Sequence, residues 1–478
     1  MKTAPSRLTR AAGVIGIALS STVLSCRSNE MTAPPIDVAA AVNSGSPTVT
    51  SVAPDSSAPG VTIDVTVNGS GFDRGSVVTL ERGGVPVATI ATNSTRFVTQ
   101  KKLVANITIA ATADTGNYDV SVTTTSGRKG VGIELFTVAY VVDELGMLGG
   151  TWSRAYAVND RGEVVGQSCT QDCLASAFYW TEAGGLEDLG TLPGYTRSAA
   201  LTINSRGHAF GMVECWMSDA ACGGEYKHQL VRWEKAGGTW TVTPLEGCTS
   251  FFNDVRVHIN NNDQCVGMSA DRSQLLFQTV AGGKVVSSVP LPDLDAAGSV
   301  ASAVSDAAMV AGSASGARHT VPVIWYRGST GAWTILPLAM PAGHSFGRAL
   351  DITEPDGAGR VRVSGYSAGA GTNGYNAVKW TLDRDVAGIW RVISTQALAF
   401  LKGTSDSWGR ALNNSGVVVG HSGQQAVLWP TSGGIEALPT PNRASSRAMD
   451  INNQGWIVGA VWDRQSGCDR AAIWRQAP

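Results

Sequence analysis

The chain has 478 residues, enough for about three modules of roughly 150 residues each. Its net charge is −2 and no basic stripe is present to neutralise a phosphate backbone, which excludes nucleic acid as a partner. Charged residues make up only 15% of the chain, and 56 residues are glycine. The 14 tryptophans outnumber the 10 phenylalanines and the 9 tyrosines. This composition disfavours coiled coils, helical bundles and disorder, and favours short strands joined by tight turns.

The N-terminus predicts export. A basic start precedes the short apolar run 11–19, which is typical of a secretory signal and shorter than the roughly 20 residues that span a bilayer. The sequence Val23-Leu24-Ser25-Cys26 resembles a bacterial lipobox, which implies that Cys26 becomes the lipidated first residue. An ordinary signal with a chance cysteine is the alternative. We expect a signal peptide over 1–25, a polar tether over 26–46, and a membrane-anchored lipoprotein at the outer membrane or cell surface of a bacterium, with the lipid as its only membrane attachment.

Strand patterns begin at Pro47. The segments 61–67, 106–109 and 116–122 are short, rich in β-branched residues and separated by turn residues, so they predict a small sandwich. No catalytic constellation appears in this part of the sequence.

Three motifs of this segment occur in the order found in the IPT/TIG family of immunoglobulin-like domains. They are Val52-Ala53-Pro54, Gly69-Ser70-Gly71-Phe72 and Gly116-Asn117-Tyr118-Asp119-Val120. The resemblance covers residues 47–138. It implies an immunoglobulin-like sandwich that acts as a spacer or an adhesive module.

The rest of the chain is built from repeats. A phrase of the form Ile/Val-Asn-x-x-Gly, followed by an apolar strand that ends in glycine, recurs from AVNDRGEVVGQS at 157–168 to DINNQGWIVGAV at 450–461. The fourth unit departs most, with Ser305 for the asparagine and Ala308 for the turn glycine. The closing glycines are Gly166, Gly211, Gly267, Gly312, Gly365, Gly420 and Gly459. Their mean spacing of about 49 residues falls among propeller blade lengths.

Each unit reads as four strands. The Asn-x-x-Gly turn joins the first two, because asparagine closes an Asx turn and glycine accepts a positive φ. The third strand ends in an aromatic residue, and these residues are Trp180, Trp233, Phe277, Trp325, Trp380, Trp429 and Trp474. The last unit stops before its fourth strand, whereas a spare strand at 141–145 precedes the first unit.

We therefore predict an all-β protein, with the immunoglobulin-like sandwich followed over 139–478 by a seven-bladed β-propeller. The N-terminal strand closes the last blade and leaves no long bare edge. A linear solenoid is the alternative, but it leaves the incomplete last unit unexplained. The phrases Asp188-Leu189-Gly190-Thr191-Leu192 and Ala177-Phe178-Tyr179-Trp180, with the Asn turn, resemble the HAF family of bacterial extracellular repeats, which implies export and repetition but no activity.

With Cys26 assigned to lipid, seven cysteines remain, and export implies an oxidising compartment. Six of these seven can form three pairs of neighbours, which leaves Cys468 over, and a different pairing of Cys468 with Cys169 or Cys173 stays open. Zinc is the rival interpretation, but the spacings form no four-ligand set, so we predict no metal and no other cofactor. We predict the disulfides Cys169–Cys173, Cys215–Cys222 and Cys248–Cys265.

Some patterns imitate enzyme motifs. The sequence 365–369 matches G-x-S-x-G, but a nucleophile elbow needs a strand-to-helix turn and this one lies within a repeat strand. The sequence 369–374 matches G-x-G-x-x-G, but a strand rather than a helix follows. The six histidines fall in different units and are interpreted as isolated, satisfied side chains. No calcium loop is visible.

An aromatic-x-Arg pattern marks a candidate binding site at the start of the first strand of five units. Strand parity places these residues on the face that carries the long connections, where function usually accumulates. Arginine binds carboxylate or phosphate, and flat aromatic rings stack on sugars, but cation–π and packing contacts are the alternative role. The residues are Trp152 and Arg154, Tyr195 and Arg197, Phe346 and Arg348, Trp408 and Arg410, and Arg447 without the aromatic.

The sequence thus favours a monomeric surface protein without catalytic residues, which binds a glycan, an anionic ligand or a protein on the propeller face. A propeller enzyme that acts on extracellular polysaccharide is the alternative. It would need paired carboxylates, or a histidine with a partner, at the channel mouth.

Overall fold

The computed structural model describes residues 45–57, 59–110, 113–245, 259–268, 274–282, 284–294, 298–315, 320–369, 374–440 and 445–475. The regular structure in these ranges is β-strand, apart from the 3-10 turn η1 (Ala220–Cys222), so the all-β prediction is confirmed. None of the described helical structure is long and apolar enough to cross a membrane. The predicted signal peptide, Cys26 and most of the tether lie outside the described residues.

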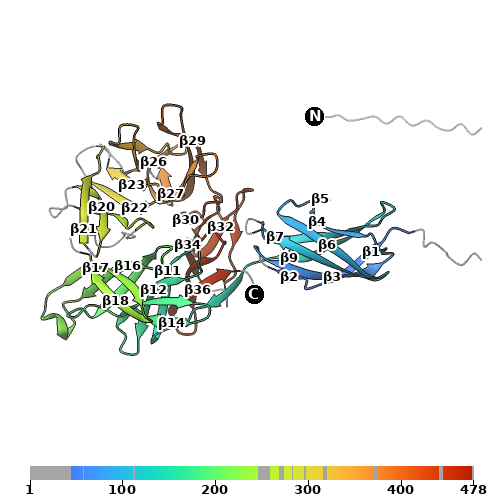
Figure 1. The fold of residues 1–478 in the computed structure, drawn as a ribbon, viewed down its shortest axis with the longest axis horizontal. Coiled ribbons are helices and arrows are strands. Elements are labelled where there is room, and N and C mark those ends of the chain that lie inside the picture. Colours follow the sequence, from blue (N-terminus) through green and yellow to red (C-terminus); the bar gives the residue numbers. More distant parts are fainter. Residues whose placement is uncertain are drawn as a thin grey trace, which may run out of the picture. The chain divides into compact units, whose positions relative to one another are not determined.

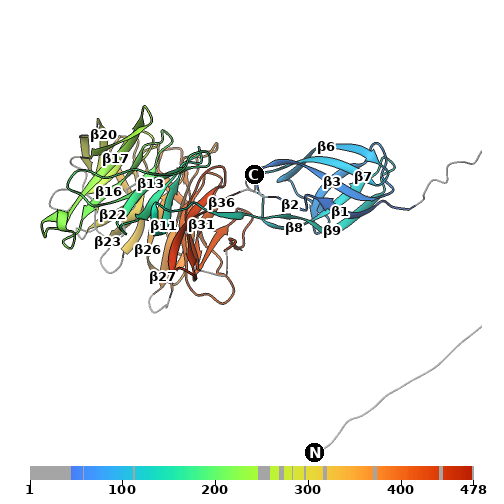
Figure 2. The ribbon, with the colours of Figure 1, turned by 90° about the horizontal axis from the view of Figure 1, so that it is seen from below.

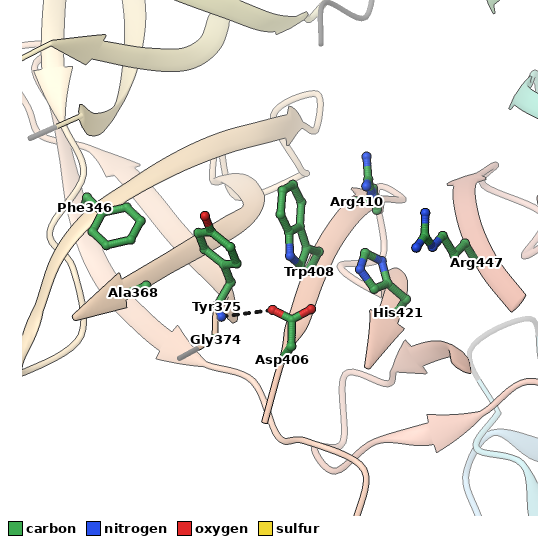
Figure 3. Close-up of a pocket in the computed structure, with 9 residues that line it drawn as sticks. All are labelled: Phe346, Ala368, Gly374, Tyr375, Asp406, Trp408, Arg410, His421 and Arg447. Atoms are coloured by element: carbon green, nitrogen blue, oxygen red, sulfur yellow. Dashed lines mark hydrogen bonds between the residues drawn. The ribbon is translucent and has the colours of Figure 1, made fainter. Parts of the chain in front are cut away.

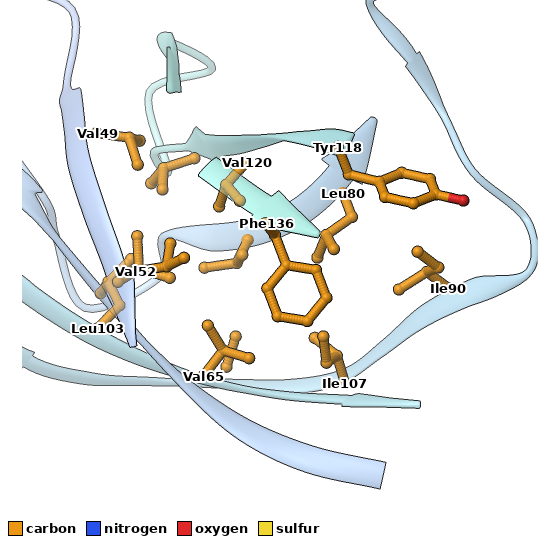
Figure 4. Close-up of a cluster of buried hydrophobic side chains, with 14 of the residues drawn as sticks. Val49, Val52, Val65, Leu80, Ile90, Leu103, Ile107, Tyr118, Val120 and Phe136 are labelled. Carbon is orange, nitrogen blue, oxygen red and sulfur yellow. The ribbon is translucent and has the colours of Figure 1, made fainter. Parts of the chain in front are cut away.

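The first nine strands form two sheets with a common core. One sheet has the order β1 (Thr48–Ala53), β3 (Thr62–Ser70), β7 (Lys102–Ile109) and β6 (Ile90–Thr99). The other has the order β2 (Ser56–Ser57), β9 (Lys129–Val138), β8 (Gly116–Thr123), β4 (Val77–Arg82) and β5 (Val85–Pro86). Leu103 and Ile107 of the first sheet and Val120 and Phe136 of the second belong to one buried cluster (Figure 4). The sheets therefore pack face to face, as the alternation in the sequence predicts.

The repeats form a series of small antiparallel sheets, numbered 1 to 7 below in chain order. Sheet 1 contains β11 (Gly149–Val158), β12 (Val164–Thr170), β13 (Ala175–Thr181) and β14 (Gly185–Asp188). Sheet 2 contains β15 (Arg197–Ile203), β16 (Ala209–Cys215), β17 (Lys227–Ala236) and β18 (Thr239–Pro244). Sheet 3 contains, in its described part, β19 (Gln264–Met268), β20 (Leu275–Ala281) and β21 (Lys284–Pro290).

The remaining sheets follow the same order. Sheet 4 contains β22 (Ser299–Val304), β23 (Val310–Ser315), β24 (Thr320–Arg327) and β25 (Trp333–Pro337). Sheet 5 contains β26 (His344–Ile352), β27 (Val361–Gly369), β28 (Asn376–Arg384) and β29 (Trp390–Ala397). Sheet 6 contains β30 (Ser407–Leu412), β31 (Val418–Ser422), β32 (Gln425–Trp429) and β33 (Glu436–Ala437). Sheet 7 contains β34 (Ser446–Ile451), β35 (Ile457–Asp463), β36 (Cys468–Arg475) and β10 (Val141–Glu144).

Sheet 7 takes its fourth strand from the start of the repeat region. Strand β10 pairs antiparallel with β36, and Val142 lies opposite Trp474. The predicted pairing of the spare strand with the last aromatic strand is therefore confirmed.

Buried apolar side chains link each sheet to the next. Each of seven clusters in the described repeats combines residues of two successive sheets. One of these clusters packs Val164 and Phe178 of sheet 1 against Val458 and Ile473 of sheet 7. The first and last sheets thus share a core, and β11 and β36 lie side by side in Figure 1 and Figure 2.

The aromatic residue that ends each third strand is buried between sheets. Trp474 of sheet 7 packs with Leu438, which follows sheet 6, and its indole N–H donates to the carbonyl of Pro439 at 2.6 Å. The indole of Trp380 donates in the same way to the carbonyl of Ala339, which follows sheet 4. These two indoles therefore satisfy their polar N–H groups while their rings fill the space between neighbouring sheets.

The asparagine of the repeat turn has two functions. Asn452 Oδ1 accepts the backbone N–H groups of Gln454 (3.1 Å) and Trp456 (2.9 Å), which is the predicted Asx turn. Its Nδ2 also donates to the backbone carbonyl of Asn159, 2.9 Å away in the first repeat. The turn glycine, Gly455, has φ 83°, as predicted. The side chain thus fixes its own turn and also bonds to the neighbouring repeat.

The residue after each turn asparagine extends this link between repeats. The backbone N–H and Nδ2 of Asn453 both donate to the carboxylate of Asp160, each at 2.8 Å. The same contact recurs between other repeats, where the backbone N–H of the residue at this position donates to the side-chain oxygen of the equivalent residue in the next repeat. The donor and acceptor pairs are Ser205 and Asn261, Asn261 and Asp306, Asp306 and Glu354, Glu354 and Asn414, and Asn414 and Asn453. The turns of successive repeats are therefore joined by a directional series of hydrogen bonds.

In the six repeats whose first strand is described, the closing glycine faces a β-bulge in that strand. In sheet 5, Ala349 lies opposite Gly365 and the register shifts directly after it. The bulge brings the carbonyl of Arg348 to 2.1 Å from where a Cβ on Gly365 would lie. A side chain cannot occupy that space, which gives the repeated glycine a steric cause.

The cysteines follow the prediction in part. The disulfide Cys215–Cys222 is confirmed, with a Cα–Cα distance of 5.6 Å. The predicted pair Cys169–Cys173 is wrong, because Cys169 points into the core from β12 and its Sγ accepts the N–H of Thr151, whereas Cys173 is exposed in the following turn with φ 57°. Cys248 lies outside the described residues, so the pair Cys248–Cys265 stays a prediction.

Candidate functional site

All five arginines of the aromatic-x-Arg pattern lie on the first strand of their sheets, but at three register positions. Arg154, Arg348 and Arg447 directly precede the residue that faces the closing glycine. Arg197 lies three positions before that residue, and Arg410 is itself the bulged residue of sheet 6. In each of these sheets the bulge comes directly after the residue that faces the closing glycine, so the five arginines occupy different positions of the repeat and are not structurally equivalent.

A disulfide-closed loop neutralises Arg197. Arg197 forms a salt bridge with Asp219 at 3.1 Å, and its guanidinium lies 4.4 Å from the centroid of the Trp216 ring. Asp219 and Trp216 lie between Cys215 and Cys222. Hydrogen bonds from Arg197 and Thr196 lower the pKa of Asp219 to about 2. This arginine therefore holds the loop, as expected of the packing alternative.

Four other predicted residues also have structural contacts. Arg154 forms a salt bridge with Asp469 of sheet 7 at 2.5 Å, and its guanidinium lies 5.6 Å from the Trp152 ring centroid. Arg348 is buried, and its Nε donates to Ser302 of the neighbouring sheet at 3.0 Å. Tyr195 packs on the apolar cluster between sheets 1 and 2. Among these residues only Arg154 also lines a cavity.

The other four residues of the pattern meet at one cavity of about 500 Å³, here called the aromatic cavity (Figure 3). Its predicted residues come from the first strands of sheets 5, 6 and 7. Its lining comprises Phe346, Ala368, Gly374, Tyr375, Asp406, Trp408, Arg410, His421 and Arg447. The volume is in the range of small-molecule pockets.

One wall of the aromatic cavity is a preassembled group of rings. The Trp408 ring centroid lies 5.1 Å from that of Tyr375 and 4.1 Å from that of Tyr366. Tyr375 and Phe346 meet edge to face at 5.9 Å. The main chain of Tyr375 is fixed as well, because its N–H donates to Asp406 Oδ1 at 3.0 Å. The rings are therefore in place before any ligand binds.

The opposite wall is cationic around a neutral histidine. His421 faces Trp408 across the strands, with stacked rings 5.9 Å apart, and only 5% of its surface is exposed. Burial, with the nearby guanidinium groups of Arg410 and Arg447, lowers the pKa of His421 to about 3. The imidazole is therefore neutral at physiological pH, and the positive charge of this wall comes from the arginines.

A second cavity of about 690 Å³, here called the basic cavity, adjoins the first. The two cavities share Arg410 and Arg447 in their linings. The basic cavity adds Arg154, Arg464 and the 41% exposed Trp462. Its carboxylate, Asp469, is the one paired with Arg154.

The sequence did not single out Tyr375, Asp406, His421 or Trp462. The interpretation of the histidines as isolated and satisfied fails for His421, whose buried Nδ1 has no hydrogen-bond partner within the described ranges. A signal for it existed, because His421 follows the repeat glycine Gly420 on β31 and so lies beside the first strand. The other three come from connections and strand ends, where the repeat pattern gives no spacing rule.

The apparent nucleophile elbow is not an exposed site. Ser367 of the G-x-S-x-G sequence is fully buried in β27 and hydrogen-bonds His344 Nδ1 at 2.7 Å. Strand β28 follows the G-x-G-x-x-G sequence, as predicted. No group of three or more histidine, cysteine or acidic side chains placed to hold a metal occurs among the described residues.

No protein-family model matches the chain, and no curated protein matches it. Among solved structures it is similar to an auxiliary nutrient binding protein from Bacteroides ovatus, with 12% identity, 91% of this chain and 99% of that chain covered, and a TM-score of 0.36. It is similar to a glucose dehydrogenase, with 11% identity, 71% of this chain and 100% of that chain covered, and a TM-score of 0.33. It is also similar to a lectin from Aleuria aurantia crystallised with Fucalpha1-6GlcNAc, with 11% identity, 69% of this chain and 95% of that chain covered, and a TM-score of 0.25. Similarities at this level define no function for the chain.

Proposed function

We propose that residues 139–478 form a seven-bladed β-propeller closed by β10, and that they follow an immunoglobulin-like domain at 47–138 in the sequence. The pairing of β10 with β36 supports this, as do the core shared by sheets 1 and 7 and the hydrogen bond from Asn452 to Asn159. The motifs quoted above are the basis for proposing the IPT/TIG and HAF families. The signal-like N-terminus and the Cys215–Cys222 disulfide support export, with lipid attached at Cys26.

The protein's proposed function is to bind, without catalysis, an anionic ligand that contains a ring. The observation that carries this is the aromatic cavity, where the fixed Trp408 ring lies beside Arg410 and Arg447. A ring of the ligand packs against the partly exposed rings of Phe346, Tyr375 and Trp408 while its anionic group accepts charge-assisted hydrogen bonds from the arginines. The guanidinium of Arg410, 4.9 Å from the Trp408 ring centroid, places charge and stacking surface side by side.

The cavity chemistry favours binding over polysaccharide hydrolysis. A glycosidase needs two carboxyl groups about 5–9.5 Å apart, and the lining of the aromatic cavity contains one, Asp406. His421 faces cationic neighbours, and its lowered pKa makes it a poor proton donor or acceptor near neutral pH.

Calorimetric titration tests this function with pairs of compounds that differ in charge, D-glucuronate with D-glucose and benzoate with benzyl alcohol. We expect the acid of at least one pair to bind more tightly than its neutral partner, and Arg447→Gln to weaken it by roughly 10- to 100-fold. Arg391→Ala is the control, because Arg391 is exposed and paired with Asp385 away from both cavities. Equal binding of acid and neutral partner, or by Arg447→Gln and wild type, would contradict the proposal.

A further inference from the structure

The two adjoining cavities have the same composition on either side of a common pair of cations. The aromatic cavity carries Trp408 and the basic cavity carries Trp462, while Arg410 and Arg447 belong to both linings. Trp408 lies at the start of β30, and Trp462 near the end of β35. The order across the site is therefore ring platform, positive charge, ring platform.

The combined lining is net positive. Four guanidinium groups, those of Arg154, Arg410, Arg447 and Arg464, face two carboxylates, Asp406 and Asp469. One of the four, Arg154, is already paired with Asp469. The remaining excess of positive charge is large enough for more than one anionic group in a single ligand.

Neutral polar groups complete the wall of the basic cavity. Gln424 and Ser445 lie in its lining beside Trp462, and they can exchange hydrogen bonds with ligand hydroxyl groups. A ligand that combines ring faces, hydroxyl groups and regularly spaced negative charge matches this pattern. An acidic peptide supplies the charge, but it does not supply a hydroxylated ring for each platform.

We propose that the two cavities are adjacent subsites for an acidic oligosaccharide, with one sugar ring against the partly exposed ring group that includes Trp408, another on Trp462, and a carboxylate held between them by Arg410 and Arg447. This inference rests on the proposed function and specifies its ligand class and length. It makes Trp462 a specificity-determining residue for ligands longer than one sugar. A single uronic acid needs only the aromatic cavity.

The test is calorimetric titration of the full chain with uronic acids of one to four units, from galacturonan, mannuronan and hyaluronan fragments. We expect affinity in at least one series to rise with length and to fall with added salt. Trp408→Ala should weaken every length by about three- to tenfold, whereas Trp462→Ala should weaken only the longer members by a similar factor. Trp216→Ala is the matched control, because Trp216 is 47% exposed and lies outside both linings.

The outcomes separate this inference from the proposed function. If single uronic acids bind in a Trp408-dependent way but affinity does not rise with length, or if Trp462→Ala has no effect, the two-subsite inference is wrong and the proposed function stands. If poly-glutamate binds with Trp462 dependence and no acidic sugar does, the ligand class is wrong. If neither acidic sugars nor benzoate bind at millimolar concentration, both proposals fail.

Discussion

The hydrogen bond from Asn452 to Asn159 joins the last repeat to the first, and the chain contains a natural control for it. Asn204 occupies the same turn position, and its Oδ1 accepts two backbone N–H groups, at 3.0 and 3.1 Å, as that of Asn452 does. Its buried Nδ2, however, has no partner in the described part of the chain. Asn452→Ala and Asn204→Ala therefore remove the same Asx turn, but only Asn452→Ala removes a bond between repeats.

The difference between the two variants measures that bond. A buried amide–carbonyl hydrogen bond contributes about 0.5–1.5 kcal/mol. The Asn159 carbonyl also accepts the N–H of Gly162, so it is not left unpaired when Asn452 is removed. Asn204→Ala additionally removes an unpaired buried donor, which reduces the loss of unfolding free energy caused by that substitution. We expect Asn452→Ala to be the more destabilising variant by about 1–2 kcal/mol.

Urea unfolding of the full chain, followed by tryptophan fluorescence, measures this difference. Both variants should unfold at lower urea than the wild type, and Asn452→Ala at the lowest. Equal unfolding free energies, or a less stable Asn204→Ala, would refute a stabilising bond between the last repeat and the first. The contact between the first and last sheets would then rest on β10 and the shared core alone.

Two further perturbations test the cavity wall and the repeat glycine. Because the pKa of His421 is about 3 when folded and roughly 6.5 when unfolded, the unfolded state binds the extra proton, so His421 should lower the unfolding free energy by about 2 kcal/mol between pH 7 and pH 5. His421→Gln should reduce this dependence, and an unchanged pH profile by urea titration would contradict it. Gly365→Ala should destabilise the protein by about 1–3 kcal/mol because the new Cβ meets the Arg348 carbonyl. Gly357→Ala is the control, because a Cβ at Gly357 lies in open space and should not destabilise the protein. Similar urea midpoints for the two variants would contradict the steric argument.

The repeat architecture could be predicted from the sequence because its determinants recur. Turn asparagines, closing glycines and aromatic strand ends each have one local cause that every copy needs. The pairing of β10 with β36 followed from the count of strands, since one unit lacked a strand and another segment had one to spare. The hydrogen bond from Asn452 Nδ2 to the Asn159 carbonyl was not predicted. An Asx turn through Oδ1 alone explains the asparagine, and the Nδ2 donor acts across 293 residues of sequence.

The binding site could be predicted only in part, for two physical reasons. Arg410 is the bulged residue of its first strand, whereas Arg447 lies two positions before the bulge of its own strand, and the aromatic-x-Arg pattern does not separate these two positions. The partners of the other arginines come from other parts of the chain, as Asp469 does for Arg154. The predicted pattern includes Arg410 and Arg447, which line cavities, but it does not separate them from Arg197, which is held in a salt bridge.

The lengths of the connections help to explain why the aromatic cavity lies at sheets 5 to 7. In sheet 2 the connection between β16 and β17 is long, and it brings Asp219 onto Arg197. In sheet 6 only Gly423 and Gln424 join β31 to β32, so this hairpin carries no acidic residue. The repeats thus supply similar arginine-bearing strands, and the inserted connections decide which arginines line a cavity. Ligand specificity can therefore change through these connections while the repeat positions stay the same.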